Sequence, residues 1–207
     1  MLNRLICLIL GYFIGAIIQT GFWIGKFNHI DIRDYGSGNA GTTNTMRTLG
    51  KKAGFITYFM DAFKSCITAI IIHFIYGSNS DISEMLLILY GGFGVVLGHN
   101  FPFYLGFKGG KGVATSLGIL LMTNWQLGLI CLVFALVLMA LTRMVSLGSI
   151  AAAILFPVLT LFVGEGHYIV ESTGIGNGYF VYSVVLAIIV LFLSLIHISE
   201  PTRPEPI

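Results

Sequence analysis

Long apolar runs separated by polar segments dominate the chain. Apolar stretches of roughly 17–25 residues are long enough to cross a bilayer as helices. Up to seven such runs occur, two of them short: Leu2–Ile24, Ala53–Tyr76, Ile82–Leu105, Gly112–Met122, Leu127–Leu141, Val145–Val163 and Gly178–Leu195. A transmembrane β-barrel would need segments of about ten residues with alternating hydrophobicity, and these runs do not alternate. The pattern therefore predicts an all-α integral membrane protein with about seven transmembrane helices.

The composition supports a membrane protein with one domain. Hydrophobic residues make up 56% of the 207 residues and charged residues only 10%, whereas an ordinary soluble domain carries about 25% charged residues. The mean hydropathy is +0.90. The first run has a long apolar core and no Ala-x-Ala cleavage site, so we expect a retained helix rather than a signal peptide. The three scattered cysteines indicate neither a metal site nor a disulfide framework.

Positive charge falls mainly on one side of the predicted membrane. With seven spans, alternate loops share a side, and one set of loops holds Lys26, Arg33, Arg47, Lys51, Lys52, Lys108, Lys111 and Arg143. The other set holds Arg4 together with Asp81, Glu84, Glu165 and Glu171. Because cytoplasmic loops are enriched in Lys and Arg, we expect the N-terminus outside and the glycine-rich loops and C-terminus in the cytoplasm. The net charge of +2 does not indicate nucleic-acid binding.

The first basic segment, which we call the first glycine loop, is "GSGNAGTTNTMRTLGKK", residues 36–52. Its glycines allow a close approach of the backbone to a ligand, and Arg47 offers a planar fork suited to phosphate or carboxylate. Side-chain donors come from Ser37, Asn39, Thr42, Thr43 and Asn44. Backbone N–H groups in such turns, next to a helix N-terminus, form anion sites. The alternative is a flexible polar connector.

The second glycine loop is "GHNFPFYLGFKGGKGVAT", residues 98–115. It differs from a nucleotide P-loop, because Leu105 stands where that motif needs Gly and Gly112 where it needs Ser or Thr. A glycine turn, two ammonium groups and a helix N-terminus near Val113 still favour an anion at the membrane surface. The alternative is that Lys108 and Lys111 extend towards lipid headgroups, which leaves the three neighbouring glycines unexplained.

The third polar segment is short: "TRMVSLGSI", residues 142–150. Arg143 fits a positive-inside anchor. Ser146 and Ser149 are three residues apart, so they share a helix face and could donate to an anion held by the other loops. Helix-packing serines are common in membranes, which is the alternative.

Two further polar patterns have a structural or chance explanation. Asp61 and Lys64 lie three residues apart within the second apolar run, close enough to pair, and we expect a structural ion pair. His29 and Asp34 fit the His-x4-Asp spacing in which a histidine acts as general base in a large class of acyltransferases. That spacing arises easily by chance and the other blocks of the class are missing, so we expect no such role.

Together, the three motifs resemble the bacterial acyl-phosphate:glycerol-3-phosphate acyltransferase family, in order and over residues 1–193. The resemblance implies a single transmembrane acyltransferase domain in the bacterial cytoplasmic (inner) membrane, with its active site facing the cytoplasm. It implies transfer of the acyl chain of an acyl phosphate to the sn-1 hydroxyl of glycerol 3-phosphate in phospholipid biosynthesis. The products are lysophosphatidic acid and phosphate, and no metal or other cofactor is implied.

The resemblance also implies substrate-binding residues, while no catalytic residue is assigned. Those expected to hold phosphate are Ser37, Arg47 and Lys111, and Ser149 is expected to position glycerol 3-phosphate. The residues that match motif positions without a separable role are Asn39, Thr43, Asn44, His99 and Lys108. Because phosphate is a good leaving group, we expect positioning and charge neutralisation to supply most of the catalysis.

The end of the chain departs from this family. After the last span, the family has a cytoplasmic block of the form Arg-His-x-x-Asn-Ile, whereas this chain reads "SLIHISEPTRPEPI", residues 194–207. The prolines preclude a continuing helix. The segment resembles the product of a reading frame that runs into sequencing-adapter DNA, so we interpret it as a non-native tail and expect impaired activity.

Two other classes of protein remain as alternatives. A membrane transporter of a phosphorylated anion would also need anion-binding loops, although its site should lie near the midplane on broken helices. A structural membrane subunit would leave the glycine loops unexplained. Acyl transfer by detergent-solubilised protein, which has no second compartment, discriminates between an enzyme and a transporter.

Overall fold

The structure is a computed structural model that describes residues 1–77, 84–142 and 144–163, with the side chains of residues 145, 146 and 160–163 left out. The described helices are α1 (Leu2–Ile17), α2 (Thr20–Phe27), η1 (Ile32–Asp34), α3 (Thr42–Leu49), α4 (Lys51–Tyr76), α5 (Glu84–Asn100), η2 (Phe103–Leu105), α6 (Val113–Thr123), α7 (Trp125–Thr142) and α8 (Val145–Val163). Arg143, the side chain of Ser146, the expected last span and the tail lie outside the described residues.

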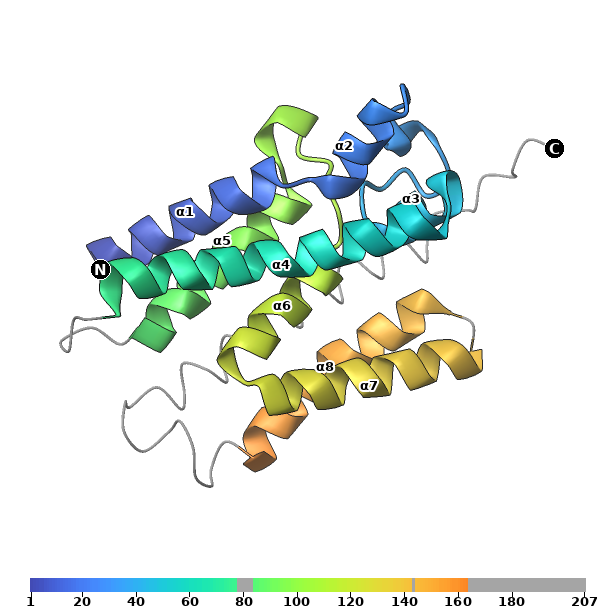
Figure 1. Ribbon diagram of the computed structural model, residues 1–207. Coiled ribbons are helices and arrows are strands. Elements are labelled where there is room, and N and C mark those ends of the chain that lie inside the picture. The colour runs from blue at the N-terminus through green and yellow to red at the C-terminus, as the bar shows by residue number, and fades with distance from the viewer. Residues whose placement is uncertain (78–83, 143, 164–207) are drawn as a thin grey trace.

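The described helices form a bundle (Figure 1). α1 and α5 pack along each other, α4 packs against α5 and α6, and α7 and α8 form a hairpin. α2, α3 and the loops around them gather at one end of α4. Among the described residues, four helical segments are long and apolar enough to cross a membrane: Leu2–Phe27, Lys51–Tyr76, Glu84–Leu105 and Trp125–Thr142. The predicted all-α membrane fold is confirmed, and the number of seven spans and their orientation stay predictions.

Small residues bring α1 and α5 into close backbone contact. A Cβ atom at Gly15 of α1 would overlap the backbone of Val95, and one at Gly98 of α5 would overlap the backbone of Tyr12. Such small-residue contacts are typical of helix pairs in membranes, where packing rather than water exclusion drives association. They place the end of α5, which carries part of the second glycine loop, against the end of α1.

The first apolar run is not one continuous helix, contrary to the prediction. α1 ends at Ile17 and α2 begins at Thr20. The buried amide of Gln19 lies in this break, and its Nε2 donates to the carbonyl oxygens of Gly98 at 3.3 Å and His99 at 2.9 Å. These bonds pair carbonyl oxygens at the end of α5, and buried polar groups within a membrane protein need such partners.

The fourth apolar run is shorter than a bilayer. α6 has 11 residues, about 16 Å at 1.5 Å per residue, against a hydrocarbon core about 30 Å thick. The preceding helix, α5, ends at Asn100, two residues before Pro102, which cannot donate the hydrogen bond that continues a helix. The chain between α5 and α6 is therefore an irregular loop.

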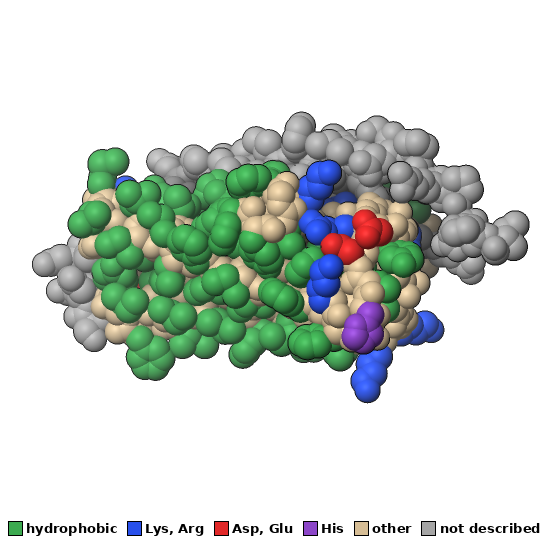
Figure 2. All heavy atoms as spheres, turned by 90° about the horizontal axis from the view of Figure 1, so that it is seen from above, with side chains coloured by type: hydrophobic (Ala, Val, Ile, Leu, Met, Phe, Trp, Pro, Cys, Tyr) green, Lys and Arg blue, Asp and Glu red, His purple; other side chains and the backbone are tan. Residues whose placement is uncertain are grey.

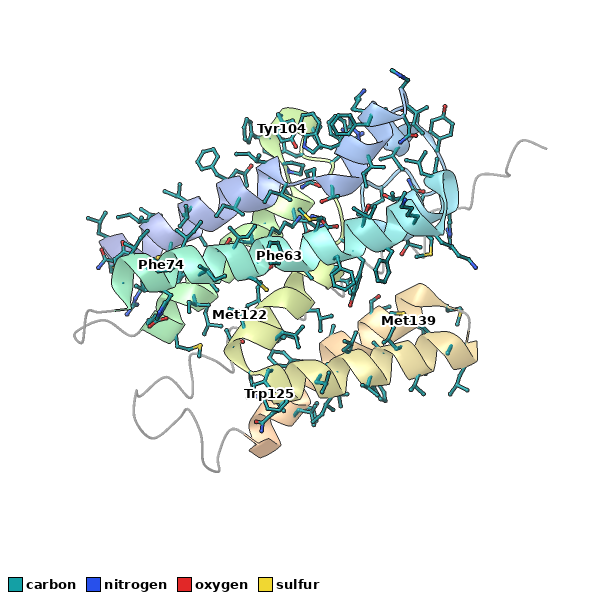
Figure 3. The ribbon with its side chains drawn as sticks, viewed as in Figure 1. Phe63, Phe74, Tyr104, Met122, Trp125 and Met139 are labelled. Atoms are coloured by element: carbon teal, nitrogen blue, oxygen red, sulfur yellow. The ribbon has the colours of Figure 1, made fainter. Side chains whose placement is uncertain are left out.

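Charge and apolar surface are separated along the molecule. Figure 2 shows Lys and Arg side chains gathered with a few acidic side chains at the end that carries α2 and α3, while hydrophobic side chains dominate the remaining described part of this face. Phe63 and Phe74 on α4 (Figure 3) are 53% and 82% exposed. Apolar exposure on this scale suits contact with lipid rather than water.

Candidate active site

The first glycine loop is organised around Asn44. The side chain of Asn44 is 1% exposed. Its Oδ1 accepts a hydrogen bond from the Ser37 N–H at 2.9 Å, and its Nδ2 donates to the carbonyl oxygens of Ile32, Tyr35 and Asn39 at 2.9–3.0 Å. One buried amide therefore holds the loop on both sides of its glycine turns.

A short helix, α3, occupies part of the segment that the sequence suggested as a loop. α3 begins after Gly41, which offers no side-chain cap, although the Gly41 N–H donates to Asn39 Oδ1 at 2.8 Å. The first N–H groups of any helix lack partners within the helix. Thr43 lies in this first turn, half-buried, and Arg47 lies exposed in the last turn.

The second glycine loop folds back onto the end of α5. The N–H groups of Gly109 and Gly110 donate to the carbonyl oxygens of Asn100 at 3.1 Å and His99 at 3.0 Å. Gly112 then adopts φ +76° as the residue before α6, again with no side-chain cap. A residue with a side chain is strained at this angle, so glycine allows the sharp entry into α6 and leaves the N-terminus of that helix open.

The two glycine loops lie against each other. A Cβ atom at Gly41 would lie 3.8 Å from the Cα atom of Gly110. Just before the first glycine loop, Arg33 makes a second contact with the second loop: its Nη1 donates to the Leu105 carbonyl oxygen at 2.8 Å, while its Nη2 binds the Asp31 carboxylate at 2.8 Å. The side-chain hydrogen bond from Arg33 lowers the pKa of Asp31 to about 2. The uncapped N-termini of α3 and α6 thus approach one another.

The remaining predicted site residues differ in exposure. Lys108 is exposed, and Lys111 is half-buried beside Gly112 and contributes to contacts within the fold. Ser149 is 5% exposed on α8. Direct binding of substrate by any of these residues stays a prediction.

Three buried polar residues near α6 were not singled out from the sequence. Asn100 is 3% exposed, and Thr115 and Ser116 in the first turn of α6 are 0% and 6% exposed. Within the described ranges, both amide atoms of Asn100 and both hydroxyls lack a hydrogen-bond partner. Asn100 Oδ1 lies 2.8 Å from the position of a Cβ atom at Gly112. Buried polar groups are normally paired, so these groups are available to a ligand or water.

The expected pair of Asp61 and Lys64 is present, and it is part of a larger buried cluster. Lys64 Nζ lies 2.9 Å from Asp61 Oδ1 and donates to the Ile18 carbonyl oxygen at 2.9 Å, in the break between α1 and α2. It also contacts His99 Nδ1. The cluster joins α4, the α1–α2 break and the end of α5 beneath the second glycine loop.

These features define a helical membrane protein with two helix N-termini and several cations gathered at one end of its bundle, an arrangement suited to an anion. Residues 5–203 match the family model described as glycerol-3-phosphate acyltransferase. The chain belongs to the glycerol-3-phosphate acyltransferase family.

Relatives and solved structures agree with this assignment. The chain is 40% identical to a glycerol-3-phosphate acyltransferase of Streptococcus thermophilus (strain LMD-9) over 96% of this chain and 88% of the relative. It is 49% identical to one of Lactiplantibacillus plantarum over 76% and 72%. It is similar to crystal structures of PlsY (YgiH), an integral membrane glycerol 3-phosphate acyltransferase. The glycerol 3-phosphate form has a TM-score of 0.72 with 36% identity, covering 94% of this chain and 87% of that chain. The lysophosphatidic acid form has a TM-score of 0.70 with 34% identity, covering 95% and 88%.

Family membership identifies the enzyme class. The predicted acyltransferase is confirmed, and the comparisons do not favour the transporter. The predicted membrane location is confirmed in its general form, because the PlsY structures are of an integral membrane protein.

Proposed function

We propose that the chain transfers the acyl group of an acyl phosphate to the sn-1 hydroxyl of glycerol 3-phosphate in the bacterial cytoplasmic membrane, at a site facing the cytoplasm. The observation that carries this proposal is the contact between the two glycine loops at Gly41 and Gly110. Two open helix N-termini next to each other provide backbone N–H groups and two positive dipole ends for a phosphate.

The chemistry needs little beyond positioning and charge neutralisation. The glycerol oxygen attacks the acyl carbon, and the bond from that carbon to the phosphate oxygen breaks. The proton of the glycerol hydroxyl ends on the released phosphate, which leaves as hydrogen phosphate. Holding both reactants in attacking geometry supplies much of the rate enhancement. Donors aimed at developing negative charge supply much of the rest.

We divide the predicted site residues of the loops and α8 into residues that shape the first glycine loop and residues that bind substrate. Asn39 and Asn44 shape the first glycine loop through their hydrogen bonds. The groups we assign to phosphate are the side chains of Ser37, Thr43, Arg47, Lys108 and Lys111. Ser149 is assigned to glycerol 3-phosphate.

The basic end of the bundle supports a cytoplasmic site. Lys26 is exposed there and lies 3.7 Å from the Asp31 carboxylate, while Lys51 and Lys52 begin α4. Positive side chains near the ends of spans remain in the cytoplasm. An acyl phosphate can then keep its chain in the bilayer and its phosphate at this end.

The test is phosphate release from acyl phosphate by purified protein in detergent, with and without glycerol 3-phosphate, together with detection of lysophosphatidic acid. We expect phosphate and lysophosphatidic acid to appear together, and only when glycerol 3-phosphate is present. Detergent removes the second compartment, so transport cannot give this result.

The assay is run on the 207-residue chain itself and on a tail-exchanged chain. In the tail-exchanged chain, the corresponding segment of the Streptococcus thermophilus relative replaces residues 194–207. We expect the exchange to raise activity strongly at matched membrane expression. Equal activity of the two chains would show that the tail is compatible with function. Folded protein that makes no lysophosphatidic acid in either form would refute the proposed function.

A further inference from the structure

The ammonium group of Lys64 is enclosed completely near the middle of α4. Lys64 is 0% exposed, and its Nζ is surrounded by Asp61 Oδ1 at 2.9 Å, the Ile18 carbonyl oxygen at 2.9 Å and His99 Nδ1. An ammonium has three donors and no acceptor, so these three acceptors satisfy it. A buried ion pair contributes little net stability compared with apolar packing, and ionisable groups in membrane spans are typically functional.

This environment determines which nitrogen of His99 carries the proton. A neutral imidazole has one N–H donor and one acceptor nitrogen. Nδ1 accepts from Lys64, and Asp61 Oδ1 is 3.7 Å from it, too far for a hydrogen bond. A doubly protonated ring would place a second cation against the ammonium. The proton of His99 therefore belongs on Nε2.

The Nε2 edge of the His99 ring faces the second glycine loop. A Cβ atom at Gly110 would overlap Nε2 more closely than any other ring atom, so only glycine lets the ring meet the loop. The backbone of His99 is held as well, because its carbonyl oxygen accepts from Gly110 N–H at 3.0 Å and from Gln19 Nε2 at 2.9 Å. Within the described part of the chain, the polar contacts of His99 involve Nδ1 and the backbone, which leaves Nε2–H for a ligand.

We propose that Lys64 and Asp61 are positioning residues that lock His99 in its neutral Nε2–H tautomer, so that His99 presents a fixed, uncharged donor to an oxygen of the anion bound at Gly110. This inference rests on the proposed function, which places substrate phosphate at that loop. It gives a specific role to a histidine whose motif position alone did not define one. A donor fixed before substrate arrives costs no reorganisation during the reaction.

Two substitutions of His99 separate its two nitrogens. His99→Gln places an amide N–H near the position of Nε2, whereas His99→Asn places its amide near Nδ1, where it can still accept from Lys64. We expect His99→Gln to keep kcat/KM within about 10-fold of the parent and His99→Asn to lose about 100-fold or more, the typical effect of removing one transition-state donor. The measurement uses acyl transfer by the tail-exchanged chain. His73→Gln and His73→Asn are matched controls, because His73 is exposed and pairs with Glu84.

A double-mutant cycle tests the role of the ion pair. Removing one partner alone would leave a buried charge, so Asp61→Asn and Lys64→Met are introduced together. We expect the two substitutions together to remove most of the activity when His99 is present. In the His99→Gln background they should lower activity only a few-fold further, because glutamine has no tautomer to lock. Equal losses in the two backgrounds, or better activity of His99→Asn than of His99→Gln, would overturn the proposal.

A spectroscopic measurement is independent of catalysis. Nitrogen NMR of histidine-labelled protein in detergent distinguishes a protonated ring nitrogen from an unprotonated one, and the signals of His99 are those lost in His99→Gln. We expect protonated Nε2 and unprotonated Nδ1 in the parent, and a mixture of tautomers in the Asp61→Asn/Lys64→Met variant. A protonated Nδ1 in the parent overturns the inference. Failure of the proposed function instead appears as absent acyl transfer with the expected nitrogen signals.

Discussion

Replacing Asn44 by leucine tests whether one buried amide holds the first glycine loop in its working shape. Leucine has the same branched arrangement of side-chain heavy atoms, is somewhat larger and has no polar atoms. The substitution removes the acceptor of the Ser37 N–H and the donor to the carbonyl oxygens of Ile32, Tyr35 and Asn39. These partners lie on both sides of the glycine turns, so the loop loses its common anchor.

The size of the effect follows from these contacts. The two amide hydrogens of Asn44 are shared by three carbonyls, so two full donations and one acceptance are lost. At about 1 kcal/mol for each net hydrogen bond, the loss is about 3 kcal/mol, and more for any partner that stays buried and unpaired. If the loop has its working shape only when anchored, about 3 kcal/mol corresponds to about 100-fold in kcat/KM.

The measurement compares kcat/KM for glycerol 3-phosphate in Asn44→Leu and in the control Thr48→Val, one turn further along α3. We expect the roughly 100-fold loss only in Asn44→Leu. Asn44→Asp should be no better, because its carboxylate faces carbonyl oxygens that need a donor. Parental kcat/KM in Asn44→Leu would refute the reasoning, since the loop would then keep its shape without the amide.

Three other predictions concern the second glycine loop and the ion pair of Asp31 with Arg33. Gly110→Ala should lower kcat/KM by about 100-fold or more, because a Cβ atom there overlaps the His99 ring. Displacement of the ring would remove one donor from the site. Parental activity of this variant would contradict the close contact. Lys111→Ala should nearly abolish transfer and Lys111→Arg should restore it poorly, because a compact ammonium differs in shape from a guanidinium; wild-type rates would exclude Lys111 from the site. Because the Asp31 pKa falls from 3.8 to about 2 in the fold, its ion pair stabilises the protein above pH about 4 and is lost as pH falls towards 2. The difference in thermal stability between the parent and Asp31→Asn should therefore shrink over that range, and a constant difference would contradict the assigned ion pair with Arg33.

The sequence predicts the membrane fold well because the length of each apolar run must match the thickness of the bilayer. It does not predict the break between α1 and α2, because Gln19 and Thr20 interrupt the middle of the apolar run only briefly and the distant partners of Gln19 lie on α5. It also does not predict α3, since residues 42–49 contain threonines and asparagine rather than the apolar spacing of an amphipathic helix. Both features depend on contacts that are distant in sequence.

The candidate site is predicted unevenly for the same reason. Glycine and lysine spacing indicates the two loops, and the structure brings their backbones together at Gly41 and Gly110. The sequence suggests Asn44 as a side-chain donor to a ligand, whereas in the structure its amide donates to the loop backbone. Asn100 lies within the second motif, but only its burial without a partner in the described residues distinguishes it from a surface asparagine.

The ion pair of Asp61 and Lys64 shows how a local pattern can have a distant function. Spacing of three residues is sufficient to predict the pair, and a pair that only stabilised α4 would need no further partner. The third hydrogen of the ammonium, however, binds the carbonyl oxygen of Ile18 in the break of the first span. The contact with His99 then extends the cluster to the second glycine loop. A helix break, a buried charge and a glycine turn thus satisfy one another's hydrogen bonds, so changing any one of them should alter the loop as well as the bundle.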